Sequence, residues 1–325
     1  MKKITRKKKI IFILSLIFIL IIVTTGLIAF AEINKISSVK LPKSDDALGI
    51  NTDVYNKLPG GKQEDTKVEI KEEKKEPTIT NIALFGDDRT SPDKNGRSDS
   101  IIVFSINETD KSLKMCSIMR DSYVSIEGHG MTKINHAYSY GGNLLAIKTI
   151  NQNFNLNIRD FIKVDFGGMQ KIVDNVGGVE IQIKDYEVQG MISSGITKSG
   201  TYNLNGKQAL AYSRIRYYGN SDFERTERQR IVIEKLFEKI KKNGVVQLLS
   251  TVNALLPYVE TSLDKTDLIN LGLKVMDFGP SSIKQQRIPY DGHYKDLMLK
   301  GVYYLQWDKE YTIKELHNFL YDYRN

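Results

Sequence analysis

The sequence predicts an α/β protein, a layered α/β/α domain around a central mixed β-sheet that follows a single N-terminal transmembrane helix. Two observations predict this fold class. An uncharged apolar run lies close to the N-terminus, and its length suits a membrane span. From Ile79 onward, short segments rich in branched apolar residues alternate with amphipathic helical segments, and this alternation is typical of layered α/β folds.

The N-terminus predicts the compartment. Residues 1–9 carry six cations, and Ile10 to Ala31 then run for 22 residues without a charge. At about 1.5 Å per residue this helix reaches roughly 33 Å, which spans a hydrocarbon core of about 30 Å. The cations predict a cytoplasmic tail at residues 1–9 and an extracytoplasmic remainder, so the protein is expected in the cell membrane as a single-pass protein. The alternative is a signal peptide cleaved after Ala29-Phe30-Ala31, but its apolar stretch would be only about 7 to 15 residues long.

The segment from Glu32 to Thr78 is predicted to be an extracytoplasmic spacer. It has few large apolar residues and ends in the mixed-charge run Lys71 to Pro77, a composition that does not favour a packed core. The catalytic domain is then expected at residues 79–325. From Ile79 onward there are 32 basic and 29 acidic residues. Because this part is nearly neutral, nucleic-acid binding is not expected despite the high isoelectric point.

Within the domain, branched apolar runs bounded by turn formers predict strands, and apolar spacing of three and four residues predicts helices. The predicted strands are residues 79–85, 100–107, 112–119, 161–166, 179–183 and 283–288. The predicted helices are residues 143–153, 169–176 and, most clearly, 223–242. Ser221 and Glu224 form a capping box before the last of these, and Asn243-Gly244 predicts its end.

Arginines cluster in the domain. Eleven arginines follow Ile79, and eight of them fall in the three short segments 86–100, 119–121 and 213–230. The planar guanidinium binds phosphate oxygens with two parallel hydrogen bonds, which lysine cannot do. A solvated network of salt bridges is the alternative for any single arginine.

The clustered charges lie where predicted strands begin and end. Asp87 and Asp88 follow the first strand, Asp99 precedes the second, and Arg120 follows the third. Strand ends are where α/β sheets place ligand sites. Carboxylates that meet there can hold Mg²⁺, with Mn²⁺ as the alternative, because Mg²⁺ takes one or two carboxylates together with phosphate oxygens.

The long helix is expected to contribute to the same site. Arg225 and Gln229 are four residues apart, so they share one face near the positive helix N-terminus. Arg228 is expected near the edge of that face, and Arg230 away from it as an exposed charge.

Other active-site types fit poorly. The sequence contains no G-x-S-x-G or H-E-x-x-H motif, and residues 200–208 do not match a P-loop. His136 is expected to support a loop rather than act as a base. Cys116 is the only cysteine and is expected to be a buried strand residue.

At these residues the chain resembles the LytR-CpsA-Psr family, whose members attach glycopolymers to the bacterial cell wall. The resemblance spans about residues 79–242 and depends on five short motifs that occur in order. These motifs are Asn81–Asp88, Gly96–Asp99, Ser117–Tyr123, Lys133–Tyr138 and Leu204–Tyr212, the last leading into Arg214, Arg216, Arg225 and Gln229.

The resemblance implies a Mg²⁺-dependent phosphotransferase. It would move a teichoic acid or capsular-type polymer, with one phosphate, from a polyprenyl-pyrophosphate carrier in the membrane to a peptidoglycan sugar hydroxyl. Carried over residue by residue, Asp88 and Asp99 would be the metal ligands, and Asp99 could also accept the proton of the acceptor hydroxyl. The implied pyrophosphate-binding residues are Arg120, Arg214, Arg216, Arg225 and Gln229.

One departure leaves two alternatives for the metal ligand. Family members usually read G-x-D-x-R after the first strand, whereas this chain reads Gly86-Asp87-Asp88-Arg89-Thr90. Gapless alignment selects Asp88, while Asp87 remains the alternative because it pairs with Arg89 in a D-x-R pattern. Two other functions also remain open. One is a lipid pyrophosphatase in which water replaces the sugar hydroxyl, and the other is a non-catalytic membrane-bound regulator or sugar-binding module.

Overall fold

The computed structural model describes residues 37–58, 78–87, 96, 98–216, 221–279 and 283–322. The predicted basic tail and the predicted membrane helix at residues 10–31 lie outside these ranges. Across the ranges that are described, no helix has the length and apolar character needed to cross a bilayer.

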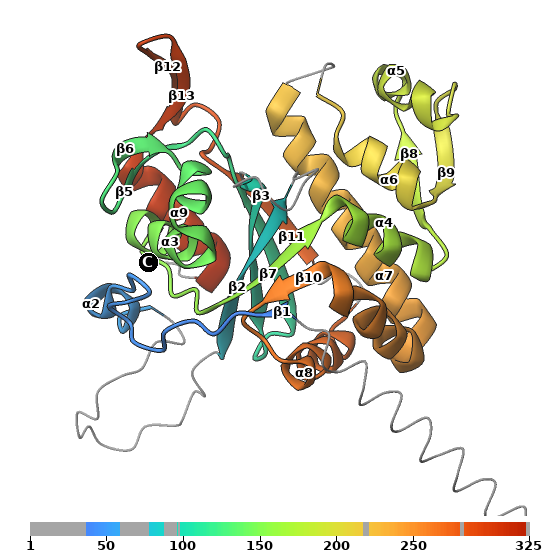
Figure 1. The fold of residues 1–325 in the computed structure, drawn as a ribbon, viewed down its shortest axis with the longest axis horizontal. Helices are drawn as coiled ribbons and strands as arrows, with labels where there is room; N and C mark the ends of the chain where they lie inside the picture. The colour runs from blue at the N-terminus through green and yellow to red at the C-terminus, as the bar shows by residue number, and fades with distance from the viewer. Residues whose placement is uncertain are drawn as a thin grey trace, which may run out of the picture.

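A mixed sheet of seven strands forms the centre of the domain, as predicted (Figure 1). Its order is β1-β10-β7-β2-β3-β4-β11. β2 is parallel to β7 and antiparallel to β3, and β4 is antiparallel to β3 and parallel to β11. The strands are β1 (Ser37–Ser38), β2 (Ile79–Asp87), β3 (Ser98–Asn107), β4 (Ser112–Ile118), β7 (Asp160–Asp165), β10 (Val259–Thr261) and β11 (Ile283–Ile288).

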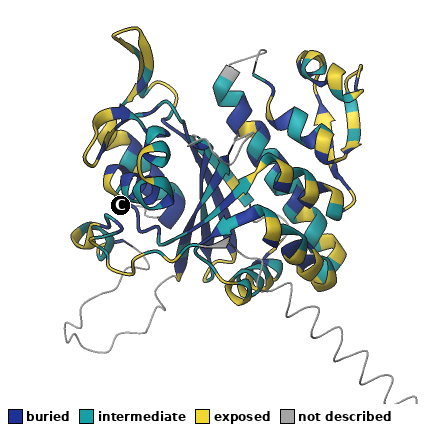
Figure 2. Ribbon diagram, viewed as in Figure 1, coloured by how far each residue is buried: buried dark blue, intermediate teal, exposed yellow. Residues whose placement is uncertain are grey.

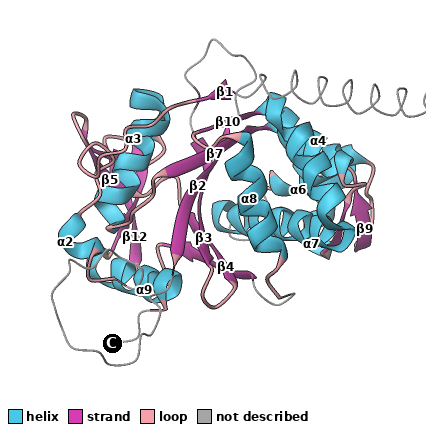
Figure 3. Cartoon of the chain, turned by 90° about the horizontal axis from the view of Figure 1, so that it is seen from below, coloured by secondary structure: helices cyan, strands magenta, loops and turns pink. Residues whose placement is uncertain are grey.

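Helices cover both faces of this sheet (Figures 1 and 3). One face carries α2 (Thr52–Tyr55), α3 (His136–Phe154) and α9 (Lys309–Tyr321), and the other carries α4 (Phe166–Asn175), α6 (Gly206–Ser213), α7 (Ser221–Leu255) and α8 (Lys265–Met276). Strand β2 has apolar side chains on both faces of the sheet, so helices must pack against both faces to bury them. Ala83 and Phe85 belong to the core under α3 and α9, while Ile82 belongs to the core under α8. The strands are consequently buried at the centre of the molecule (Figure 2).

Three two-stranded sheets lie outside the central sheet. They are β5 (Tyr123–Ile126) with β6 (Gly130–Lys133), β8 (Val179–Ile183) with β9 (Gly200–Leu204), and β12 (Tyr294–Leu299) with β13 (Val302–Trp307). The predicted strand at residues 179–183 is therefore present, but it pairs with β9 and not with the central sheet. Short α5 (Val188–Met191) lies between β8 and β9, and the β12–β13 hairpin projects from the domain (Figure 1).

The predicted spacer is partly folded. Within residues 32–78, β1 pairs with β10 at the edge of the central sheet. Leu48, Ile50 and Leu58 are buried in the core that α3 and α9 cover. The composition of this segment is polar, but these few apolar side chains are enough to hold residues 37–58 on the domain. Residues 59–77 lie outside the described ranges.

Helix α7 is longer than predicted and bends where its end was expected. The prediction placed the helix end at Asn243-Gly244. Gly244 has φ +81° and ψ −172°, which is not helical, and a second helical segment follows as far as Leu255. Glycine adopts this φ without the steric cost that a side chain would add. The bend turns the second segment toward α8, where Leu248 contacts Gly272.

Candidate active site

A cavity of about 300 Å³ lies between the central sheet and helices α4, α6 and α7. Apolar side chains line it from the middle of the elements, including Ile102 and Ile162 on the sheet and Ile233 on α7. Charged and polar side chains line it from the start of β3, the end of α6 and the start of α7. These are Asp99, Ser100, Ser213, Arg214, Arg216, Arg225 and Gln229, and Asp165 at the end of β7 adds a second carboxylate. The cavity therefore has a charged part and an apolar part.

A second cavity of about 200 Å³ extends the apolar part. It lies between the sheet, the second segment of α7 and α8, and it shares Ile162 and Leu255 with the first cavity. Its other walls include Phe104, Phe237 and Val275. The second cavity thus adds apolar space beside the first, between the shared residues and α8.

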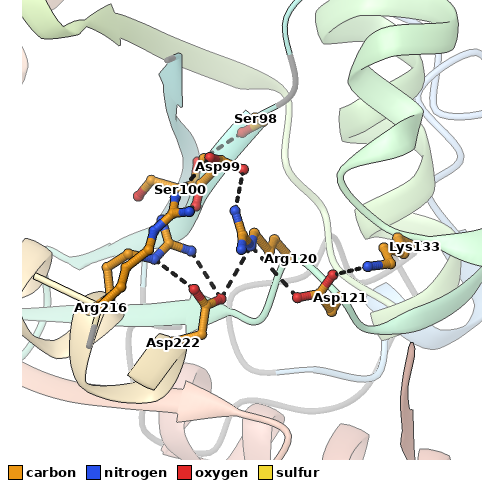
Figure 4. Close-up of polar contacts among 9 residues, drawn as sticks. Ser98, Asp99, Ser100, Arg120, Asp121, Lys133, Arg216 and Asp222 are labelled. Carbon is orange, nitrogen blue, oxygen red and sulfur yellow. Dashed lines mark hydrogen bonds and ion pairs between the residues drawn. The ribbon is translucent and has the colours of Figure 1, made fainter. Parts of the chain in front are cut away.

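Asp99 is central to a network of charges at the start of β3 (Figure 4). Arg120 Nη1 donates to Asp99 Oδ1 at 2.7 Å, and Arg216 Nη2 donates to Asp99 Oδ2 at 3.1 Å. The Nε of Arg120 lies 3.2 Å from Asp222 Oδ2 and 3.6 Å from Asp121 Oδ2. Burial lowers the pKa of Arg120, but the three neighbouring carboxylates more than offset it and hold the pKa above its usual value. Arg120 thus stays charged.

Arg225 lines the same cavity, but its guanidinium is already engaged. Its Nε and Nη2 donate to the two oxygens of Asp222 at 2.9 and 3.0 Å, and its Nη1 donates to the backbone oxygen of Asp99 at 2.9 Å. Only 3% of its side chain is exposed. Arg225 therefore ties α7 to β3, and Asp222 lies between Arg225 and Arg120. In this arrangement the planar fork binds a carboxylate of the protein.

Arg214 and Arg216 are the arginines most open to a ligand. Arg216 is 39% exposed and uses one nitrogen to bind Asp99. Arg214 is exposed and lies over the Phe166 ring at 4.5 Å. No ion pair links Arg214 to another of the residues that the structure describes. Their free donors lie at the cavity, where they can bind phosphate oxygens.

On the long helix, Gln229 lies where it was predicted, whereas Arg228 and Arg230 are more buried than predicted. Gln229 shares the cavity-lining face with Arg225, as predicted, and its Oε1 is buried with no hydrogen-bond partner among the described residues. Arg228 is fully buried and pairs with Glu187. Arg230 was expected to be exposed, and this is wrong. It is buried, and it donates to Ser117 Oγ at 2.6 Å.

Sequence reasoning assigned no role to three residues of the network. Lys133 Nζ pairs with Asp121 at 2.5 Å, so charges alternate from Lys133 through Asp121 to Arg120 and Asp222 (Figure 4). Asp222 carried a usable signal, since it lies three residues before Arg225 at the start of a helix, where acidic residues are favoured. Lys133 and Asp121 are in the quoted motifs but far apart in sequence from α7, so only the fold brings them together.

The predicted metal ligands can be placed only in part. Asp88 lies outside the described residues. Asp87, the alternative, is buried at the end of β2, with its Oδ2 3.9 Å from Lys163 Nζ. Within the described ranges, no three His, Cys, Asp or Glu side chains are grouped so that they could hold a metal ion. Asp99 contributes one hard oxygen donor group at the cavity, which suits Mg²⁺ as one ligand among several.

Two further expectations concern residues outside the network. His136 begins α3, and its Nδ1 lies 2.9 Å from Thr132 Oγ1 on β6, so it connects the loop between these elements. Cys116 is buried in β4 as predicted, and burial raises the pKa of its thiol to about 12.

Residues 49–319 match the model of the LytR_cpsA_psr family. This range is most of the chain, and it includes the whole charge network. The chain belongs to the LytR-CpsA-Psr family.

Two relatives of this LytR-CpsA-Psr protein carry different descriptions. Regulatory protein MsrR of Staphylococcus aureus (strain Mu50) is 34% identical over 220 residues, which are 66% of this chain and 66% of MsrR. Polyisoprenyl-teichoic acid–peptidoglycan teichoic acid transferase TagU of Enterococcus faecalis is 35% identical over 219 residues, 66% of this chain and 69% of TagU. The match to MsrR thus spans just under two thirds of that protein's length.

Solved structures of TagT share the fold of this LytR-CpsA-Psr protein. TagT bound to LI-WTA aligns with a TM-score of 0.64 and 26% identity, covering 82% of this chain and 97% of TagT. TagT with bound octaprenyl pyrophosphate lipid aligns with a TM-score of 0.60 and 25% identity over the same shares of the two chains.

Proposed function

We propose that this protein transfers a glycopolymer, together with one phosphate, from a polyprenyl-pyrophosphate carrier to a peptidoglycan sugar hydroxyl. The bond from the sugar oxygen to phosphorus forms as the pyrophosphate bridge breaks, and polyprenyl phosphate leaves. The observation that carries the proposal is the first cavity, whose charged part, with Arg214 and Arg216, adjoins an apolar part lined by residues such as Ile102 and Ile233. A prenyl pyrophosphate likewise has a charged part, the pyrophosphate, and an apolar part, the prenyl chain. The teichoic acid transferase activity named for TagU and the octaprenyl pyrophosphate bound by TagT support it.

The arginines are proposed to bind the pyrophosphate. The linked network joins the cations Lys133, Arg120, Arg216 and Arg225 to the carboxylates Asp121, Asp222 and Asp99 (Figure 4). Beside it, Arg214 adds a positive charge and Asp165 a negative one to the cavity lining, so the cations remain in excess. This excess suits an anion, and phosphoryl transfer depends on positioning the reactants and neutralising charge on the phosphate oxygens. Arg214 and Arg216 have the accessible donors. Arg120 and Arg225 fix the positions of Asp99 and Asp222 around them.

Asp99 is proposed to take the proton of the acceptor hydroxyl. Both of its oxygens bind guanidinium groups. When phosphate oxygens compete for Arg216, this arginine withdraws less charge from Asp99 Oδ2, and that oxygen becomes a better acceptor for a hydroxyl proton. The oxygen held by Arg120 keeps the carboxylate in place. The buried Oε1 of Gln229 has no hydrogen-bond partner among the described residues, so it would accept a hydrogen bond from a donor group of the ligand.

We also propose that Mg²⁺ is held by Asp99 and Asp88, with phosphate oxygens as the remaining ligands. When bound, the ion would neutralise charge on the phosphate oxygens. Asp87 is the weaker candidate because it is buried beside Lys163. An excess of chelator should abolish turnover, and Asp88→Ala should abolish it while Asp87→Ala retains it. Full activity in chelator would contradict the metal proposal, and the opposite order of the two variants would select Asp87.

The cell membrane is the proposed location, with residues 10–31 as a retained anchor and the domain outside. The uncharged run and the cations before it support this topology. Protease added to intact, wall-stripped cells should degrade the domain. Full protection would contradict the orientation, and a mature N-terminus at Glu32 would contradict a retained anchor.

The decisive experiment supplies purified full-length protein with lipid-linked polymer, Mg²⁺ and peptidoglycan. The transferase proposal expects polymer joined to peptidoglycan through one phosphate, and Asp99→Asn, which keeps the side-chain shape, should lose this product. Free phosphorylated polymer without a wall-bound product would establish a lipid pyrophosphatase instead. Binding of the lipid without any turnover would support the regulator that the description of MsrR suggests.

A further inference from the structure

An apolar patch lies on the second segment of α7, directly after the bend at Gly244. Val245, Val246 and Leu249 form this α7 patch, and Val246 is 81% exposed. Leu248 of the same segment is buried against α8. The segment therefore has a packed side and an apolar side that the described domain leaves uncovered. Such exposure costs free energy in water unless something covers it.

The charges beside the α7 patch indicate what could cover it. Lys239, Lys241 and Lys242 lie near the end of the helix segment before the bend, where the one acid, Glu238, pairs with Lys235. The salt bridges among the described residues include none of these three lysines. An apolar group bordered by lysines is the composition of surfaces that lie on anionic bilayers, where apolar side chains enter the headgroup boundary and lysines face the lipid phosphates.

The N-terminal tether restricts where the bilayer can be. The predicted membrane segment ends at Ala31 and β1 begins at Ser37. The chain between them extends at most about 20 Å. β1 pairs with β10, which follows α7 closely in the chain. Figures 1 and 3 place β1, α8 and the second segment of α7 on the same side of the domain, away from the β12–β13 hairpin. The tether therefore keeps this side near the membrane surface.

The second, apolar cavity lies at the same elements. Val252 and Leu255 of the second α7 segment, and Leu256 directly after it, line the second cavity together with residues of α8. Leu249, in the α7 patch, precedes Val252 by one helical turn. A bilayer at the α7 patch would thus lie next to the apolar end of the cavity, with the charged end on the far side.

We propose that the α7 patch rests on the membrane, so that the apolar end of the cavity faces the bilayer and the arginines face away from it. This inference uses the proposed anchor and is independent of the transfer reaction. A prenyl chain could then pass from the bilayer into the cavity without crossing water.

The test measures the depth of single labelled positions in full-length protein reconstituted in vesicles with anionic lipid. Val246→Cys and Met298→Cys, the latter 61% exposed on the β12–β13 hairpin, each receive an environment-sensitive fluorophore. The native Cys116 is buried with a raised pKa, so the unsubstituted protein serves as the control for background labelling. Lipids that carry a quencher on the acyl chain are then introduced.

We expect the label at residue 246 to lose at least about half of its fluorescence, and the label at residue 298 to be unaffected. Adding Val246→Glu to a Leu249→Cys reporter should reduce the quenching at residue 249, because a charge opposes insertion. Equal quenching at residues 246 and 298, or none at residue 246, would overturn the inference. Because no substrate is present, the measurement does not depend on activity. Quenching at residue 246 in a protein that proves inactive would still support the inference, and no quenching there in an active protein would refute it.

Discussion

Arg214 and Arg225 line the same cavity, and replacing each by alanine should separate ligand binding from stability. Arg225→Ala removes three charge-assisted or backbone hydrogen bonds and leaves Asp222 without its bidentate partner. Because the guanidinium is buried and Asp222 is partly exposed, we expect a loss of about 2 to 4 kcal/mol in the free energy of unfolding. Arg214 is exposed, so Arg214→Ala should change the free energy of unfolding by less than about 0.5 kcal/mol.

Ligand affinity should show the complementary effect. Arg214→Ala loses a charge-assisted contact with phosphate worth about 1.5 to 3 kcal/mol, which corresponds to roughly a 10- to 150-fold weaker affinity for a prenyl pyrophosphate. Arg214→Lys should recover part of this loss, since lysine keeps the charge but not the planar fork.

Urea unfolding and calorimetric titration with a short-chain prenyl pyrophosphate measure the two effects separately. Arg214→Ala should unfold at the same urea concentration as the unsubstituted protein and bind poorly. If it binds normally, or if it destabilises the protein as much as Arg225→Ala does, then the division into ligand-binding and structural arginines is wrong.

Two further predictions concern stability. Burial lowers the pKa of His317, whose Nε2 lies 3.0 Å from the Phe154 oxygen, below the 6.5 of an exposed histidine. The unfolded chain therefore takes up the proton first, so the urea midpoint should fall as the pH decreases below about 6.5, and less so in His317→Gln. Gly206→Ala would place its Cβ 2.2 Å from the Gln170 oxygen, and thermal unfolding should report a loss of about 1 to 3 kcal/mol. Gly279→Ala is the matched control and should be near neutral, because among the described residues, its chain neighbours aside, no atom lies within 4 Å of the added Cβ.

The fold was largely predictable because its central strands are buried on both faces. Continuous branched apolar runs such as those at residues 79–85 and 112–119 carry a strong signal. β10 has only three residues, and β12 and β13 have mostly exposed or half-buried side chains. Such strands lack that signal. Their pairing depends on partners elsewhere in the chain, which composition cannot reveal.

The candidate site was predictable as a group of residues but not as a set of pairs. Clustering and helical spacing placed Arg225 and Gln229 at the site. Neither observation could reveal that Asp222 occupies the fork of Arg225, or that Arg230 turns inward to Ser117. These contacts depend on how α7 packs against β3 and β4. A charged residue is expected to be exposed on composition alone, and Arg230 departs from that expectation because it finds a buried hydrogen-bond partner.

The strand order also bears on how the domain is made. β11 lies beside β4, and Ile283 pairs with Leu113, so the edge of β4 stays unpaired until most of the chain has been synthesised. Contacts between such distant residues slow folding, and an open strand edge favours aggregation during the delay. A chain that stops before Ile283 contains every residue of the charge network of Figure 4, and still cannot complete the sheet that holds the network together.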